Sequence, residues 1–125
     1  NPGPAGRKEA GAVGAEKTDY TKTKKYRALR KALEDNLEAR GLEAEQYADK
    51  VVEYMELWIM RAQLRDDVKN RGTVVPDHKN GGMKENRSVT LMLQTSRQML
   101  AIFAALGFRQ EAIKAEVLAS EDDEL

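Results

Sequence analysis

Apolar residues recur at helical spacing in three separate stretches of the chain. In the first stretch, from Lys22 to Arg40, apolar positions lie three or four residues apart, and Gly41 follows as a residue suited to end a helix. The second stretch runs from Ala44 to Asn70 and would be about 40 Å long at the standard helical rise. Only a short turn separates the two stretches, so they predict a helical hairpin.

The second predicted helix carries an apolar stripe that is wider than one partner helix would cover. Val52 and Ile59 lie beside the main stripe, so we expect the central turns to be covered on more than one side. The main stripe consists of Tyr47, Val51, Tyr54, Met55, Trp58 and Ala62.

The third stretch, from Ser88 to Leu106, has the most regular pattern. Its inward positions alternate steps of three and four, as the a and d positions of a coiled coil do. This seam consists of Val89, Met92, Ser96, Met99, Phe103 and Leu106. Leu91 and Ile102 lie off the seam, where a monomeric hairpin would leave them in water and an oligomer interface would bury them.

A polar segment separates the second and third predicted helices. It contains a β-favouring run at residues 73–75 and the turn-favouring pair Asn80-Gly81, which together predict a small β-hairpin. Pro76 restricts the first strand to an edge. Two short strands are only marginally stable alone, so we expect them to pack on the helices or on a neighbouring subunit.

The ends of the chain differ from its middle. Residues 1–19 are rich in Gly, Ala, Pro and charge, and we expect a disordered arm. A short final helix is expected from Arg109 to Leu118, before an acidic and loose C-terminal tail at residues 119–125. Residues 20–118 are then one all-α domain, a long antiparallel helical hairpin with an additional N-terminal helix and a small β-hairpin.

Opposite charges are segregated along a chain whose net charge is zero. Residues 1–31 carry nine basic and three acidic side chains, whereas residues 32–60 carry eight acidic and two basic ones. Basic residues concentrate around the start of the first helix, where they would attract phosphates without reading sequence. These candidate DNA-binding residues are Lys22, Lys24, Lys25, Arg27, Arg30 and Lys31. A solvated helix face has the same composition, so charge alone leaves both interpretations open.

Residues that could carry catalysis or hold a metal are scarce. The chain has no Cys and one His, His78, and its serines lack the glycine-rich surroundings of a nucleophile elbow. Gly81-Gly82 lacks the spacing of a phosphate-binding Walker loop. Neighbouring acids such as Asp66-Asp67 diverge on a helix. We therefore expect no catalytic residue, no metal site and no cofactor.

The cellular location follows from what the sequence lacks. No run approaches the roughly 20 apolar residues of a membrane span, and the first residues lack the apolar core of a signal peptide. The absence of Cys fits a reducing compartment. We expect no membrane association and a cytoplasmic location.

Between Arg71 and Gly107, a helix ending in Gly72 is followed by Thr73-Val74, then by Asn80-Gly81, Lys84 and Asn86, and then by an apolar helix ending at Leu106-Gly107. This order resembles the C-terminal half of a family of small terminase subunits, the DNA-recognition component of the packaging motors of tailed phages. The resemblance covers roughly half of the chain and is a short-motif match. The chain departs from the family at Arg87, where Pro is usual, and at Phe108-Arg109-Gln110, where a Leu-Thr-Pro-like sequence is usual.

The resemblance implies a non-catalytic subunit with three partners. It would form a cyclic homo-oligomer, bind double-stranded viral DNA near the packaging start, and recruit or regulate the terminase large subunit in the host cell cytoplasm. The offset apolar faces of the long helices also favour a ring. The candidate oligomer-interface residues are Leu91, Ile102, Trp58 and Ile59.

Other functions fit parts of the same pattern. Small terminase subunits of some phages carry a helix-turn-helix, but the first turns of the second helix here are acidic and would face phosphates. A dimeric helical adaptor would use the heptad seam to bind another helix. A small DNA-binding regulator would act without a motor and bind a symmetric site as a dimer.

Overall fold

The computed structural model describes residues 18–123, with side chains described up to residue 119. Most of the expected disordered arm and the last two residues of the expected tail lie outside these limits. The elements are η1 (Tyr20–Lys22), α2 (Lys24–Ala39), α3 (Glu45–Arg71), β2 (Val74–Pro76), β3 (Met83–Glu85), α4 (Arg87–Ala105) and α5 (Gln110–Asp123). The predicted helical class is confirmed, and so is the small β-hairpin.

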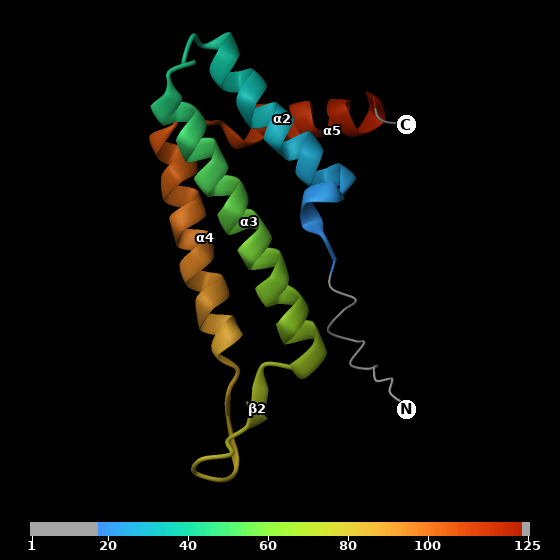
Figure 1. The fold of residues 1–125 in the computed structure, drawn as a ribbon, viewed down its shortest axis with the longest axis vertical. Coiled ribbons are helices and arrows are strands. Elements are labelled where there is room, and N and C mark those ends of the chain that lie inside the picture. Colours follow the sequence, from blue (N-terminus) through green and yellow to red (C-terminus); the bar gives the residue numbers. More distant parts are fainter. Residues whose placement is uncertain (1–17, 124–125) are drawn as a thin grey trace.

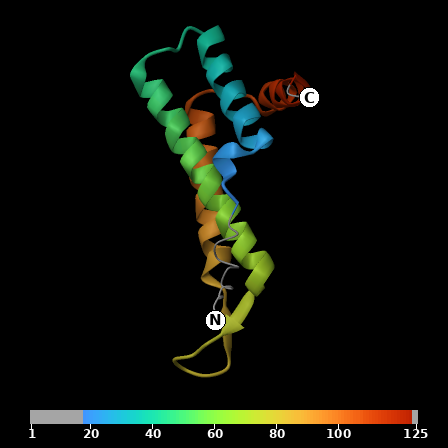
Figure 2. The same cartoon turned by 45° about the vertical axis from the view of Figure 1, so that its right-hand side comes forward.

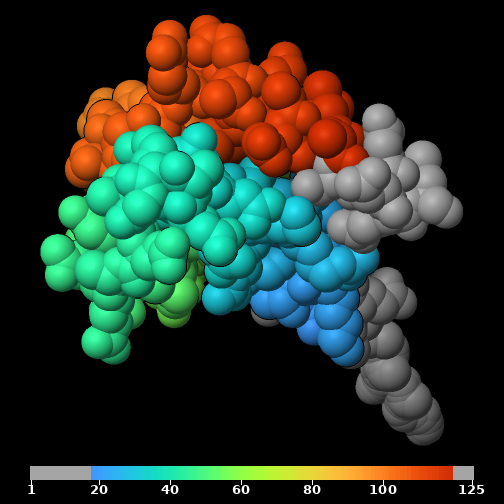
Figure 3. All heavy atoms as spheres, turned by 90° about the horizontal axis from the view of Figure 1, so that it is seen from above, coloured from blue at the N-terminus to red at the C-terminus, as the bar shows by residue number. Residues whose placement is uncertain are grey.

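The two longest helices, α3 and α4, form an antiparallel hairpin that sets the length of the molecule (Figure 1). After a 45° turn α4 lies largely behind α3, and the two helices pack against each other (Figure 2). The β-hairpin lies at one end, with Val75 paired with Lys84. At the other end α2 packs on α3, and α5 lies alongside α2 (Figure 3). No single helix among residues 18–123 has the length and hydropathy of a membrane span; α4 and α5 meet that test only as a pair bent by 97°.

The core lies where α2 is covered from two sides. Leu33 and Ala32 of α2 are completely buried, and Val51 and Met55 of α3 are 1% exposed. The same buried cluster includes Ile113 of α5, so the last helix contributes to the main core. Because α2 is covered from two sides, it buries Ala28 and Ala32 in addition to Tyr26, Leu33 and Leu37.

The buried stripe of α4 differs from the predicted seam. Its buried residues are Ser88, Thr95, Met99 and Ile102, and Leu106 just beyond its end is also buried. Four residues of the predicted seam, Val89, Met92, Ser96 and Phe103, are only partly buried. In heptad terms the inward face is rotated from the predicted a and d positions toward the d and g positions.

This difference bears on one candidate interface residue. Ile102 is 8% exposed and belongs to the core of the single chain, so little of its side chain remains exposed for an oligomer interface. Leu91 is half-buried. The large apolar side chains that α4 exposes are instead Leu93, at 57%, and Leu100, at 68%.

The last helix is longer than predicted. It was expected to end at Leu118, but α5 continues to Asp123, so residues 119–123 of the expected loose tail are helical. These residues include neither Gly nor Pro, the two residues that most disfavour a helix interior, so nothing in the sequence stops the helix at Leu118.

Arg40 joins the end of α2 to the end of α4. Its Nη2 donates a hydrogen bond to the backbone oxygen of Leu106 at 2.7 Å, and its guanidinium lies 5.6 Å from the centroid of the Phe108 ring. Gly107 lies between these two contacts with φ +72°, and a Cβ there would come within 3.0 Å of Arg40 Nη1. Gly107 therefore allows both the turn and the close approach of Arg40.

A partly buried polar cluster connects α3, the β-hairpin and α4 at their junction. The Asn86 side chain is fully buried, accepts from the backbone N–H of Ser88 at 3.0 Å and donates to Gly72 O at 2.9 Å. It also donates to Asp67, which accepts from both Arg71 and Ser88. Hydrogen bonds from Arg71, Ser88 and Asn86 stabilise the charged carboxylate, so the pKa of Asp67 is well below its ordinary value.

The low pKa of Asp67 predicts a pH-dependent contribution to stability. Because the folded pKa lies below the unfolded value of about 4, the contribution is complete above that value and declines as pH falls further. Near neutral pH we expect Asp67→Asn to unfold at a lower denaturant concentration than the wild type, with the gap narrowing below pH 4. A gap that is unchanged between pH 7 and pH 3 would contradict this prediction.

The double coverage of α2 predicts that Leu33 is critical for stability. Leu33→Ala removes a completely buried side chain and should cost about 2–5 kcal/mol in the free energy of unfolding. The matched control is Leu93→Ala, because Leu93 is 57% exposed and its loss should leave stability nearly unchanged. Urea unfolding followed by circular dichroism measures both, and equal effects would contradict the proposed core.

Candidate nucleic-acid interface

The basic end of α2 is held in place by two anchors. Thr23 caps the helix, since its Oγ1 accepts from the backbone N–H of Tyr26 at 3.1 Å. The hydroxyl of Tyr20 donates to Asp66 of α3, and its ring meets the edge of Trp58 at a centroid distance of 6.0 Å. These contacts fix the start of α2 against α3 and give its charged side chains a defined direction.

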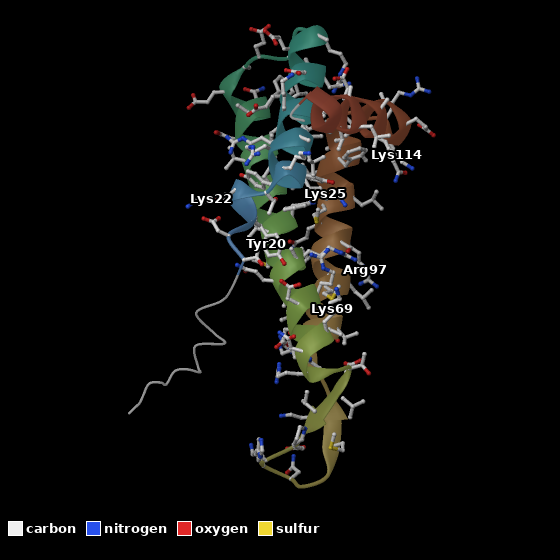
Figure 4. All side chains as sticks on the ribbon, turned by 90° about the vertical axis from the view of Figure 1, so that its right-hand side faces the viewer. Tyr20, Lys22, Lys25, Lys69, Arg97 and Lys114 are labelled. Atoms are coloured by element: carbon white, nitrogen blue, oxygen red, sulfur yellow. The ribbon has the colours of Figure 1, made fainter. Side chains whose placement is uncertain are left out.

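The six candidate DNA-binding residues do not share one face. Successive helical residues turn by about 100°, so Lys24, Arg27 and Lys31 point to the same outer side of α2. Lys25 points elsewhere and lines a groove together with Lys114 of α5. Figure 4 shows Lys25 and Lys114 toward the same end of the molecule.

Several of the six contact acidic or backbone groups nearby. Lys31 Nζ lies 2.8 Å from Asp35, and Arg30 Nε lies 3.1 Å from Glu34. Arg30 also donates to the hydroxyl of Tyr26 at 3.2 Å. Exposed pairs of this kind are weak and are screened by salt, so a phosphate could replace the acid as partner.

The other candidate DNA-binding residues differ in the contacts that they make. Lys22 is 83% exposed and lies 3.9 Å from Asp19, and Arg27 donates to the backbone oxygen of Lys22 at 2.6 Å. Lys24 and Lys25 have no acidic partner within ion-pair distance in the part of the chain that the structure describes. The first turn of α2 therefore has positive charge that no neighbouring acid in that part neutralises.

Charge along α2 runs against the helix dipole. Its first turn contains Lys24 and Lys25 and no acid, and its last turn contains no basic residue. Glu34, Asp35 and Glu38 occupy the second half instead. A cation near a helix N-terminus costs a few tenths to about 1 kcal/mol, so this order of charges does not serve helix stability. It does concentrate positive potential at one end of α2.

The loop cations lie far from this end. Lys79, Lys84 and Arg87 are exposed in and beside the β-hairpin, at the opposite end of the α3–α4 hairpin from α2 (Figure 1). In the same turn, backbone N–H groups of Asn80 and Lys79 donate to Asp77 and lower its pKa. The structure therefore does not bring the loop cations together with those of α2.

An amphipathic groove lined by residues of α2, α3, α4 and α5 was not predicted from the sequence. Its volume is about 790 Å³, and Tyr54, Trp58 and Phe103 contribute aromatic surface to it. Burial raises the pKa of Tyr54. Arg61 lies on its wall, where its Nε donates to Ser96 Oγ at 2.6 Å. Helical periodicity indicated that the aromatic residues face inward but not that a groove stays open above them.

Two of the candidate oligomer-interface residues, Trp58 and Ile59, belong to α3. Trp58 lines this groove, and Ile59 is partly buried against the core. Among residues 18–123, no group of three or more His, Asp or Glu side chains is positioned to hold a metal ion. The chemistry available at this end of the molecule is cationic and aromatic.

Comparison of the chain with protein-family models, with curated proteins and with solved structures gives no match. We therefore infer the function from the positions of the basic residues of α2 and from the motif resemblance.

Removing the acids that pair with Arg30 and Lys31 should strengthen binding to polyanions. We expect Glu34→Gln with Asp35→Asn to elute from a heparin column at higher salt than the wild type, because both cations become available to sulfate groups. The matched control, Glu43→Gln with Glu45→Gln, makes the same change in net charge at the α2–α3 turn and start of α3. Equal shifts for both variants would indicate an effect of net charge alone.

Proposed function

We propose that this protein is a non-catalytic small terminase subunit that recognises viral DNA for genome packaging and recruits or regulates the large ATPase and nuclease subunit. It holds double-stranded DNA against the basic end of α2 and acts as a ring of identical subunits in the host cell cytoplasm. The observation that carries the proposal is the set of cations at the start of α2, which opposes the helix dipole and projects from an anchored helix.

The residues that carry the motif resemblance support the proposal because they lie where the long helices begin and end. Gly72 ends α3 with φ +88°, and Asn86 caps the start of α4. Leu106 and Gly107 end α4. The residues that carry the similarity to small terminase subunits therefore lie at the helix ends that shape the helical hairpin.

One observation favours a second candidate function. The groove beside Trp58 has the size and amphipathic lining of a site for a helix, as a dimeric helical adaptor would need. A small DNA-binding regulator would need a two-fold dimer with two equivalent basic surfaces. An adaptor ignores DNA at moderate salt, whereas a regulator and a terminase subunit both bind it.

The outer face of α2 provides the direct test of DNA binding. Lys24→Gln, Arg27→Gln and Lys31→Gln together should weaken binding to a duplex about tenfold or more near 0.1 M salt, and should reduce the slope of log affinity against log salt by roughly two to three. Fluorescence anisotropy of a labelled duplex at several salt concentrations measures both quantities.

The matched control is Lys79→Gln, Lys84→Gln and Arg87→Gln, which removes the same charge at the β-hairpin. Its affinity and salt slope should stay close to those of the wild type. If the control loses as much affinity as the α2 variant, or if the α2 variant keeps the full salt slope, DNA does not bind where we propose.

A further inference from the structure

The groove beside Trp58 has two features of a docking site. Its interior combines aromatic and aliphatic side chains, among them Tyr54, Trp58 and Leu100, and Leu100 is 68% exposed. Basic groups surround this apolar interior. These are Lys25 from α2, Arg61 from α3 and Lys114 from α5. An apolar groove with a basic rim fits a partner that offers apolar side chains flanked by acids.

The outer face of α3 has this complementary character. Val52 and Met60 are 39% and 49% exposed, large fractions for such side chains. Asp49, Glu53 and Glu56 surround them and are exposed as well. These five residues recur at steps of one, three and four, so they form one continuous exposed stripe, here called the acidic stripe.

The groove and the acidic stripe lie on different sides of the same helix. With about 100° between successive residues, Tyr54, Trp58 and Arg61 point roughly opposite to Val52 and Glu56. One copy therefore cannot place its acidic stripe in its own groove. Two copies can, and each keeps one surface free for another neighbour.

We propose that the groove of one subunit receives the acidic stripe of a second copy of this chain. Val52 and Met60 of the incoming α3 cover the apolar interior near Trp58, while its acids face the basic rim. The contact joins two different surfaces, so it is heterologous, and its repetition closes a ring if the rotation permits. A net charge of zero divided between opposite surfaces favours such association.

This inference rests on the self-association in the proposed function but not on its DNA-binding part. It changes the role of Lys25, one of the six candidate DNA-binding residues. In the proposed contact Lys25 faces a neighbouring subunit, whereas Lys24, Arg27 and Lys31 lie on the outer side of α2, away from the groove.

Charge reversal tests the contact in the full chain. Lys25→Glu with Lys114→Glu reverses the groove rim, and Asp49→Lys with Glu56→Lys reverses the acidic stripe. By sedimentation velocity each pair should shift the assembly to smaller species. The chain with all four substitutions should recover it, because the reversed surfaces again attract each other. A matched reversal outside the contact, Glu38→Lys with Glu43→Lys, should leave the assembly unchanged.

Trp58 gives a second and independent readout, since it is the only Trp of the chain. Its emission should shift to shorter wavelength as the wild-type protein associates, and this shift should be absent in either charge-reversed pair and present in the four-site variant. Circular dichroism melting curves verify that each variant is folded.

The outcomes separate this inference from the proposed function. A wild-type chain that stays monomeric at high concentration overturns both the ring and this contact. An assembly that neither reversal affects, or that the four-site variant fails to recover although it folds, overturns the contact alone. DNA binding by the outer face of α2 is measured separately and survives either result.

Discussion

The packing of α2 between α3 and α5 is the contact on which the rest of the structure depends. The α3–α4 hairpin alone would leave Val51 and Met55 facing water, and α2 covers them with Leu33. In turn α5 covers α2 with Ile113. Arg40 secures this arrangement by linking the end of α2 to Leu106 and Phe108. Loss of α2 or α5 would expose apolar surface to water, and so small a domain has little other core in which to bury it.

This packing also determines where the basic side chains of α2 point. Because two sides of the helix are covered, these side chains point either to the outer side of α2 or to the groove beside α5. Lys24, Arg27 and Lys31 lie on the outer side, and Lys25 lines the groove. One basic segment can therefore supply both a surface for DNA and the rim of a contact between subunits. The neutral net charge of the chain conceals this division.

Local sequence patterns predicted the elements better than the surfaces between them. Helical spacing, together with Gly72 at the end of the second helix, located the long helices to within about two residues of the observed bounds, because caps and periodicity act locally. The inward side of α4 was predicted only in part: Met99 and Leu106 are buried as expected, but Thr95 and Ile102 are buried in place of Ser96 and Phe103, since burial depends on which helices surround α4. The presence of Lys25 and Lys114 on one groove was beyond sequence reasoning, because it results from α5 folding back along α2.

If identical subunits assemble around or beside viral DNA, as we propose, native mass spectrometry of the full chain will detect the assembly. The protein would be measured at moderate ionic strength, alone and with a short DNA duplex. We expect one closed oligomer of many subunits that gains the mass of the duplex when DNA is present. A monomer or dimer that leaves the duplex unbound would contradict it.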